Sequence, residues 1–245
     1  MDSLVGLLDG PRARGAFVLR SVMEPPWSLR IQDQAPLTVV AIVAGNAWVT
    51  PDHGEPQQLL AGDVAVMRGP NPYTFTDDPE TPDNIIIHPG QVCTTLDGED
   101  LAERMDLGVR TWGNDLNGSM TMLTGTYEMH SEVGERLLRS LPELVVLREG
   151  PADLPVIDLL NHEIGKEEPG QGAVLDRLLD LLVSGGLRAG FARPEADVPA
   201  WYRAYGDPVV GAAIRTIQNQ PGHHWSVGSL AEAVGVSRAT LARRF

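Results

Sequence analysis

The apolar residues of this 245-residue chain change their spacing near Ser131. Before that point, short runs rich in β-branched residues alternate with Gly, Pro, Asn and Asp, which is typical of short strands joined by turns. The expected strands are 16–22, 27–31, 37–43, 47–50, 57–60, 64–67, 73–76, 84–88 and 120–129, with a hairpin turn at 51–54. Many short strands of this kind predict a small β-barrel or sandwich.

After Ser131 the apolar residues recur three and four positions apart, which indicates helices. We expect one helix from Val133 to Leu141, ended by Pro142, and another over 156–164. The segment 173–187 is apolar around more than one face, so we expect it to be buried on two sides. It is either an interior helix of the first domain or the seam of a dimer, and its spacing does not distinguish the two.

Composition excludes several classes of protein. The chain contains one cysteine, Cys93, so no disulfide can form within it. No run of about 18 uncharged apolar residues occurs, so no membrane span is expected. The first residues lack the basic start and long apolar core of a secretory signal, which favours a cytoplasmic protein.

Charge is distributed unevenly between the two ends. The formal net charge is −14, which argues against nucleic acid at first sight. From residue 201 to 245, however, five arginines stand against Asp207 and Glu232, a balance of +3. The other 200 residues hold 14 basic and 31 acidic groups, a balance of −17. Since phosphate binding requires only local positive charge, the asymmetry indicates two modules with different partners.

The last 39 residues predict three short helices with well-marked ends. Asp207 followed by proline is a typical helix start, and Pro221 with glycine after it ends that helix. Ser226 and Ser237 are expected to cap the next two helices, and Gly235 provides the tight turn between them. The inner faces would hold Val210, Ala213, Ile214 and Ile217, then Val227, Leu230, Ala231 and Val234, then Leu241 and Phe245.

The other side of the third helix is basic. The residues outside its core-facing positions are Arg238, Ala239, Thr240, Ala242, Arg243 and Arg244. Arginine can bridge phosphates or read guanine, and Ala or Thr can contact a thymine methyl, so these are candidate DNA-binding residues. The alternative is a solvated helix end, where cations merely suit the helix dipole.

The run from Trp225 to Phe245 resembles the first helix-turn-helix of AraC-family transcription regulators. The matching features are W-[ST]-V-x-x-L-A near its start and G-x-S-x-x-x-L-x-R-x-F at its end. The resemblance implies that the last helix enters the major groove of double-stranded DNA, with Arg238, Ala239, Ala242 and Arg243 facing the bases. Members of that family carry a second helix-turn-helix downstream, so a truncation after Phe245 and weak DNA binding by these residues are expected.

Residues 45–73 are similar to the core of a cupin barrel, with Leu59, Gly62 and Asp63 preceding a strand. The resemblance predicts an α+β chain: a cupin-type sensor and dimerisation domain over 1–190, a linker over 191–206, and the all-α helix-turn-helix over 207–245. Cupin enzymes place a metal-binding histidine where this chain has Tyr73, and the strand 27–31 contains no histidine. His53 is expected in an exposed turn. A cupin enzyme is therefore not expected.

A different metal site is conceivable from three other residues. His88, Cys93 and His130 lie at or just beyond expected strand ends, and two imidazoles with a thiolate suit zinc if the fold brings them together. The alternatives are three ordinary loop residues, a redox-sensitive Cys93 assisted by His88, or a Cys93 that is simply a small buried apolar side chain.

These features together predict a homodimeric DNA-binding transcription regulator. Its cupin-type domain would sense a small molecule or a metal or redox signal, and segment 173–187 would join the subunits. Two alternatives stay open: a cupin-type enzyme with a helical tail, and a ligand-binding module with no DNA-binding role. Neither the effector nor the direction of regulation follows from the sequence.

Overall fold

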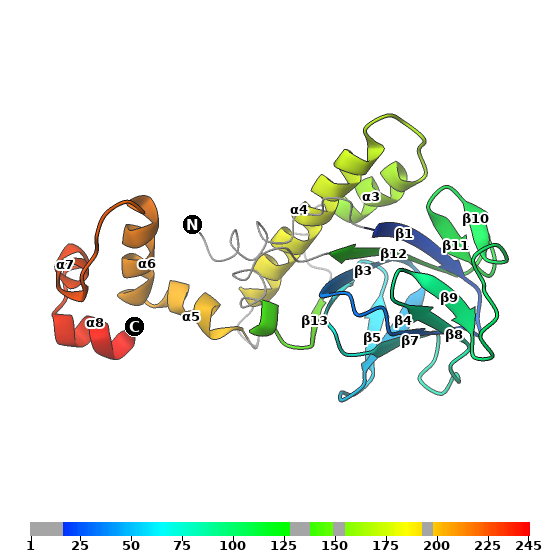
Figure 1. The fold of residues 1–245 in the computed structure, drawn as a ribbon, viewed down its shortest axis with the longest axis horizontal. Helices are drawn as coiled ribbons and strands as arrows, with labels where there is room; N and C mark the ends of the chain where they lie inside the picture. Colours follow the sequence, from blue (N-terminus) through cyan, green and yellow to red (C-terminus); the bar gives the residue numbers. More distant parts are fainter. Residues whose placement is uncertain (1–16, 128–137, 149–154, 193–197) are drawn as a thin grey trace.

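The computed structural model describes residues 17–127, 138–148, 155–192 and 198–245 (Figure 1). Its strands are β1 (Phe17–Met23), β2 (Ser28–Ile31), β3 (Leu37–Ala44), β4 (Asn46–Pro51), β5 (Gln57–Leu60), β6 (Val64–Arg68), β7 (Tyr73–Thr76), β8 (Ile85–His88), β9 (Val92–Thr95), β10 (Asp106–Gly108), β11 (Thr111–Gly113), β12 (Met120–Tyr127) and β13 (Leu144–Leu147). Its helices are α3 (Val156–Ile164), α4 (Gln171–Phe191), α5 (Ala200–Gly206), α6 (Val210–Asn219), α7 (Val227–Ala233) and α8 (Arg238–Arg244).

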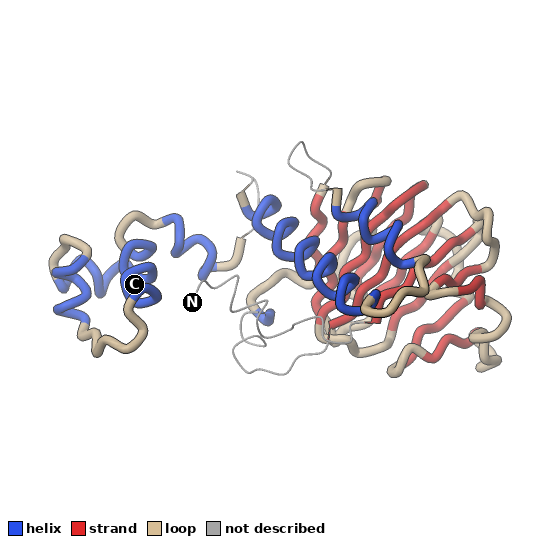
Figure 2. The backbone as a smooth tube through the Cα atoms, turned by 90° about the horizontal axis from the view of Figure 1, so that it is seen from above, coloured by secondary structure: helices blue, strands red, loops and turns tan. Residues whose placement is uncertain are grey.

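The strands form two facing sheets. The larger sheet has the order β10-β11-β1-β12-β3-β6-β13, and the smaller has the order β5-β4-β7-β2-β8-β9. Neighbouring strands are antiparallel except in the pairs β1–β11 and β2–β8. Figure 2 shows α3 and α4 lying across one face of the strands, while α5 to α8 extend away from them. The expected barrel or sandwich with following helices matches this mixed α+β architecture.

Strand β3 is buried on both faces, which explains its continuous apolar sequence. Leu37 and Val39 pack in the cluster that also holds the helices α3 and α4. Val40 and Ile42, which alternate with them, pack in the cluster between the two sheets. The larger sheet is therefore the middle layer, with the smaller sheet on one side and the two helices on the other.

Helix α4 buries one face against the larger sheet. Leu175, Leu179 and Leu187 are almost fully buried there. The sheet has a glycine, Gly125, where a Cβ atom would lie only 2.5 Å from a methyl group of Leu179, so its absence lets the helix approach closely. The expectation of burial on two sides holds for one side only, because Leu181 is 43% exposed within this chain.

Most of the strands were predicted within one or two residues, but some were not. Strands β9, β10, β11 and β13 were not predicted, because they are short and three of them pair at sheet edges. The expected helix over 133–141 falls largely on residues outside the described part of the chain. Helix α5 lies inside the expected linker 191–206, so part of that segment is structured.

The last three helices form a small separate core. Ala213, Leu230, Ala231 and Leu241 are its buried members, and Trp225 and Val234 pack against them. Ser226 and Ser237 cap α7 and α8 by accepting hydrogen bonds from the backbone N–H of Ser229 and Thr240, as predicted. Gly235 has a φ of 72°, the conformation that the tight turn requires.

The prediction that Phe245 lies on the inner side of the last helix is wrong. Its side chain is 65% exposed, whereas Leu241, four residues earlier, is 2% exposed. Phe245 follows the last turn of α8, so its direction is not set by the helix that buries Leu241. Val227 and Ile217, also expected inside, are 47% and 36% exposed.

None of the helices in the described ranges is long and apolar enough to cross a lipid bilayer.

Candidate functional site

Helix α8 presents a basic surface opposite its buried side. Leu241 anchors the helix in the small core, while Arg238, Ala239, Ala242 and Arg243 are exposed. Positions 238, 239, 242 and 243 fall on one side of a helix because they are one, four and five residues apart. These are the four residues that the sequence resemblance placed against bases. They form what we call the α8 surface.

The other two predicted DNA-binding residues are engaged within the protein. The Thr240 hydroxyl lies 2.8 Å from that of Ser237, inside the cap of α8. Arg244 forms an ion pair with Asp207, at 3.6 Å between Nη1 and Oδ2, and so links α8 to the start of α6. The backbone N–H groups of Val210 and Val209, together with Arg244, lower the pKa of Asp207.

The second candidate site is a cavity between the two sheets, with a volume of about 250 Å³. Its walls are mainly aliphatic and come from both sheets, and it is lined in part by Leu19, Leu29, Ile31, Val40, Ile87 and Met122. Polar side chains also line it, among them Asp33, Thr38, Tyr73, Gln91 and Thr111. We call this space the inter-sheet cavity. A concave, mostly apolar site with few polar groups is the usual form of a small-molecule binding site.

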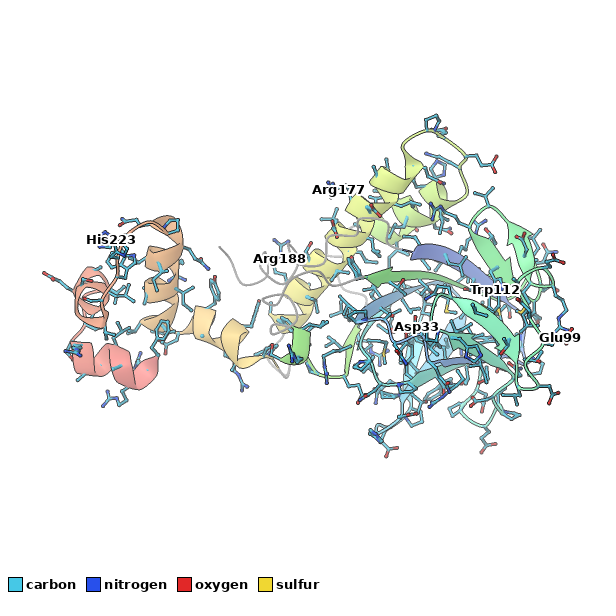
Figure 3. All side chains as sticks on the ribbon, viewed as in Figure 1. Asp33, Glu99, Trp112, Arg177, Arg188 and His223 are labelled. Carbon is cyan, nitrogen blue, oxygen red and sulfur yellow. The ribbon has the colours of Figure 1, made fainter. Side chains whose placement is uncertain are left out.

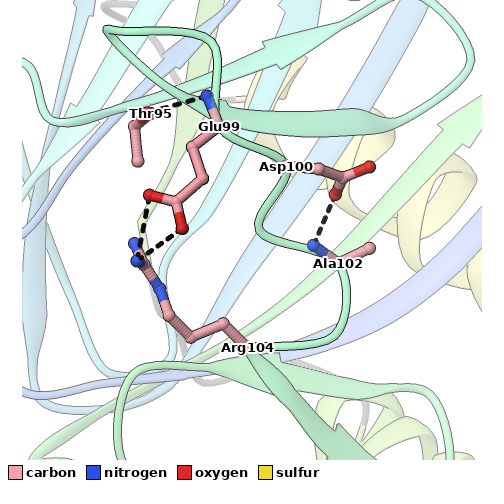
Figure 4. A network of polar contacts seen from close by, with 5 residues as sticks. All are labelled: Thr95, Glu99, Asp100, Ala102 and Arg104. Atoms are coloured by element: carbon pink, nitrogen blue, oxygen red, sulfur yellow. Dashed lines mark hydrogen bonds and ion pairs between the residues drawn. The ribbon is translucent and has the colours of Figure 1, made fainter.

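The loop between β9 and β10 closes part of the inter-sheet cavity. Figure 4 shows the local contacts of this loop. The Glu99 carboxylate forms an ion pair with Arg104 at 3.4 Å, and the backbone N–H of Glu99 donates a hydrogen bond to the Thr95 hydroxyl. Asp100 accepts a hydrogen bond from the backbone N–H of Ala102, which lines the cavity. Leu101, between them, is fully buried. The exposed polar contacts thus shape a loop from which Leu101 and Met105 point inward, while Leu96 is exposed.

Tyr73 and Thr38 bring hydroxyl groups to the inter-sheet cavity. Tyr73 occupies the place where the resemblance to cupin enzymes implies a metal-binding histidine. Burial raises the pKa of its phenol, which a hydrogen bond with Thr38 partly offsets, so the hydroxyl stays protonated at neutral pH. His53, expected in an exposed turn, is exposed between β4 and β5.

The structure does not bring the three predicted zinc ligands together. In the β8–β9 hairpin, Ile87 is paired with Cys93 and His88 with Val92, so His88 and Cys93 project from opposite faces. Cys93 lines the inter-sheet cavity, whereas His88 bonds Thr94 at 3.0 Å on the outer face. His130 lies outside the described residues. Among the described residues, no three His, Cys, Asp or Glu side chains are grouped to hold a metal.

The thiol of Cys93 is weakly acidic. Burial, with a smaller effect of Asp100, raises its pKa to about 11. A redox-sensing cysteine requires the opposite, a lowered pKa that increases the thiolate fraction. Cys93 is half-buried, and its environment suits a small apolar side chain.

We expect Cys93 to react slowly with iodoacetamide in the folded protein. At about pH 8, alkylation should be roughly a hundredfold slower than in the protein unfolded in guanidinium, where the thiol has its ordinary pKa. The rate should rise with pH up to about 11. Since the folded state favours the neutral thiol, its contribution to stability is present below the unfolded pKa and is lost as the pH rises toward 11. A rate that levels off below about pH 9 would contradict the raised pKa.

Sequence reasoning found the α8 surface but missed the residues of the inter-sheet cavity. Figure 3 shows Asp33 and Trp112 among the strands of the two sheets, far apart along the chain. Trp112 is 8% exposed and lines the cavity from β11, a strand that was not predicted. Asp33 follows β2 and also lines it. No pattern in the sequence pointed toward these two positions.

The architecture consists of two facing sheets, two helices that cover the larger sheet, and three further helices, α6 to α8, with a core of their own. A family model described as Cupin (Cupin_6) matches residues 2–192. The chain therefore belongs to this cupin family.

Relatives are similar over the whole chain, including its last three helices. A protein of Streptomyces lividans named an AraC-like transcription regulator is 25% identical over 253 residues, which cover 100% of this chain and 78% of that protein. The transcriptional regulator AlkR of Acinetobacter baylyi is 25% identical, with coverage of 100% and 79%. Among solved structures, apo ToxT from Vibrio cholerae is similar at a TM-score of 0.40, with 9% identity, over 92% of this chain and 72% of ToxT.

Proposed function

We propose that this protein is a DNA-binding transcription regulator of the AraC type. The observation that carries the proposal is the α8 surface: two arginines and two alanines exposed on one side of a capped helix, opposite the buried Leu241. A recognition helix of a helix-turn-helix has this form, since it needs one side for packing and one for base edges. The names of the relatives over the same length support the proposal.

The charge distribution also indicates that the α8 surface is the part of the chain that faces DNA. The segment from 201 to 245 is positive, and the rest of the chain is strongly acidic. The acidic barrel is repelled by phosphates, so the helix-turn-helix is the part that approaches the duplex. Arg215 on α6 adds positive charge to this part of the chain.

The cupin domain acts as the sensor in this proposal, and the inter-sheet cavity is where a small effector binds. A metal or redox signal through His88 and Cys93 is less favoured, because the two side chains face opposite sides of one hairpin. The exposed residues Val174 and Leu181 on α4 are suited to join two copies of the chain, since large apolar side chains favour burial. Effector binding would then change whether two helix-turn-helix units reach their half-sites.

The test is selection of duplexes from a random DNA library by the purified chain, followed by fluorescence anisotropy on the enriched sequence. We expect enrichment of a common motif and an affinity that falls steeply as salt rises, because phosphate contacts release counterions. Binding that is salt-dependent but equal for every sequence would leave only a nonspecific basic end. No binding at low salt would favour the alternative, a cupin-type ligand-binding module or enzyme without a DNA-binding role.

A further inference from the structure

The inter-sheet cavity carries more acidic than basic charge. Its ionisable side chains with fixed charge are Asp33, Asp106 and Arg110. Asp106 and Arg110 are exposed, so their charges are largely screened by water. Asp33 is half-buried, so water screens its charge less, and it is the carboxylate that a bound molecule would sense most strongly.

Asp33 is held in place by neutral donors. Its Oδ1 accepts the backbone N–H of Ala35 at 3.0 Å, and its Oδ2 accepts the amide of Gln91 at 3.0 Å. Within the described residues, no ion pair includes Asp33. Its charge also reaches Tyr73, whose pKa it helps to raise. The carboxylate of a bound ligand would therefore meet a negative charge that is not engaged in an ion pair within the described residues.

Trp112 contributes a hydrogen-bond donor to the cavity, an indole N–H that has no acceptor among the described residues. Its side chain is 8% exposed, and its Nε1 has no hydrogen-bond partner among the described residues. In the register of β1 and β11, Trp112 is paired with Ser21, and both line the inter-sheet cavity. Buried N–H groups are nearly always satisfied in folded proteins, so an unpaired one beside a cavity indicates where an acceptor atom of a ligand would lie.

The volume limits the size of a ligand. A protein cavity of about 150 Å³ can hold benzene, so about 250 Å³ accommodates roughly ten non-hydrogen atoms. The aliphatic walls favour a ligand that is apolar over most of its surface.

We propose that the inter-sheet cavity binds a mostly apolar molecule that carries no negative charge and has a hydroxyl or carbonyl oxygen that accepts a hydrogen bond from Trp112, and that Asp33 excludes carboxylates. This inference rests on the proposed function only where the bound molecule is taken to be the effector of a regulator. The binding itself follows from the cavity and requires no DNA.

The test compares three probes of about ten non-hydrogen atoms: nonanol, nonylammonium and octanoate. Binding is measured by calorimetry without DNA, and its location by protection of Cys93, the one cysteine of the chain, from alkylation at alkaline pH. We expect nonanol to bind and to slow alkylation, and octanoate to bind at least about tenfold more weakly, because a like charge faces Asp33.

Three variants separate the contributions of individual residues. Trp112→Phe should weaken nonanol roughly fivefold, because it removes the N–H donor and keeps most of the ring. Trp27→Phe is the matched control, since the Trp27 indole N–H is also buried and unpartnered but does not line this cavity; it should leave the affinity for nonanol unchanged. Asp33→Asn should strengthen octanoate about tenfold and change nonanol by less than about twofold.

The proposal is overturned if octanoate binds as tightly as nonanol or nonylammonium, if none of the probes binds, or if binding leaves the alkylation of Cys93 unchanged. An equal loss in Trp112→Phe and Trp27→Phe would also overturn the role of Trp112. These outcomes are independent of the DNA assay, so a failure here leaves the proposed regulator intact, and a failure to bind DNA leaves this cavity assignment intact.

Discussion

Replacing Arg238 and Arg243 together with alanine is expected to weaken binding to the selected DNA motif about a hundredfold, since each bidentate contact with a base is worth roughly 1–3 kcal/mol. Both side chains are exposed on the α8 surface, and in the described part of the chain neither forms an ion pair or side-chain hydrogen bond that holds the fold. Anisotropy on the selected and a scrambled duplex measures the loss, and discrimination between the two duplexes should fall as well.

Two single variants serve as controls. Arg177→Ala removes an exposed arginine on α4, whose ion pair with Asp180 lies on the surface, and should leave DNA binding unchanged. Arg244→Ala breaks the ion pair with Asp207. It should weaken binding to the selected and the scrambled duplex by a similar factor, smaller than that of the double variant. If the Arg238/Arg243 variant keeps its preference for the selected motif, α8 does not read the sequence and the assignment of the recognition helix is wrong.

The second large effect concerns the layer of helices over the larger sheet. Leu160→Ala is expected to lower the free energy of unfolding by about 2–5 kcal/mol, because the leucine is 1% exposed in the cluster shared by α3, α4 and the sheet. The adjacent Leu159 is 49% exposed, so Leu159→Ala should change stability by less than about 0.5 kcal/mol. Urea unfolding followed by tryptophan fluorescence measures both.

This neighbouring pair makes the comparison specific. The two variants change the same residue type in the same helix, so intrinsic helix propensity affects them equally. Equal and small effects would show that α3 does not pack against the sheet in solution as it does here. Equal and large effects would show that the exposed side of α3 is covered as well.

The parts of this protein that depend on local sequence were predictable. Ser226, Gly235 and Ser237 mark the ends of α7 and α8, and each acts through backbone groups within a few residues. The exposed and buried sides of α8 followed from helical periodicity alone, apart from Phe245 after its last turn. The ion pair of Arg244 with Asp207 was not predicted, because it joins helices that are distant in sequence.

The parts that depend on strand register were not predictable. The spacing of His88 and Cys93 suggested a shared site, but the hairpin places Cys93 opposite Ile87, and a difference of one residue in register changes the face on which a side chain projects. The inter-sheet cavity has the same origin. Asp33 and Trp112 come to one space only through the pairing of β1 with β11 and of β2 with β8, both of which are parallel and non-local.

The difference in size between the cores has a consequence for the order in which the molecule loses its structure. The helix-turn-helix core contains four buried residues, two of them alanines, whereas each barrel cluster is several times larger. Local opening costs less where little apolar surface is buried, so the amides of α6 to α8 should exchange with solvent sooner than those of β3 or β12. Warming would then abolish the α8 surface while the barrel still encloses its cavity. A duplex bound to α8 would in turn protect these amides from exchange. The free energy needed to order the three helices would then lower the net affinity for DNA.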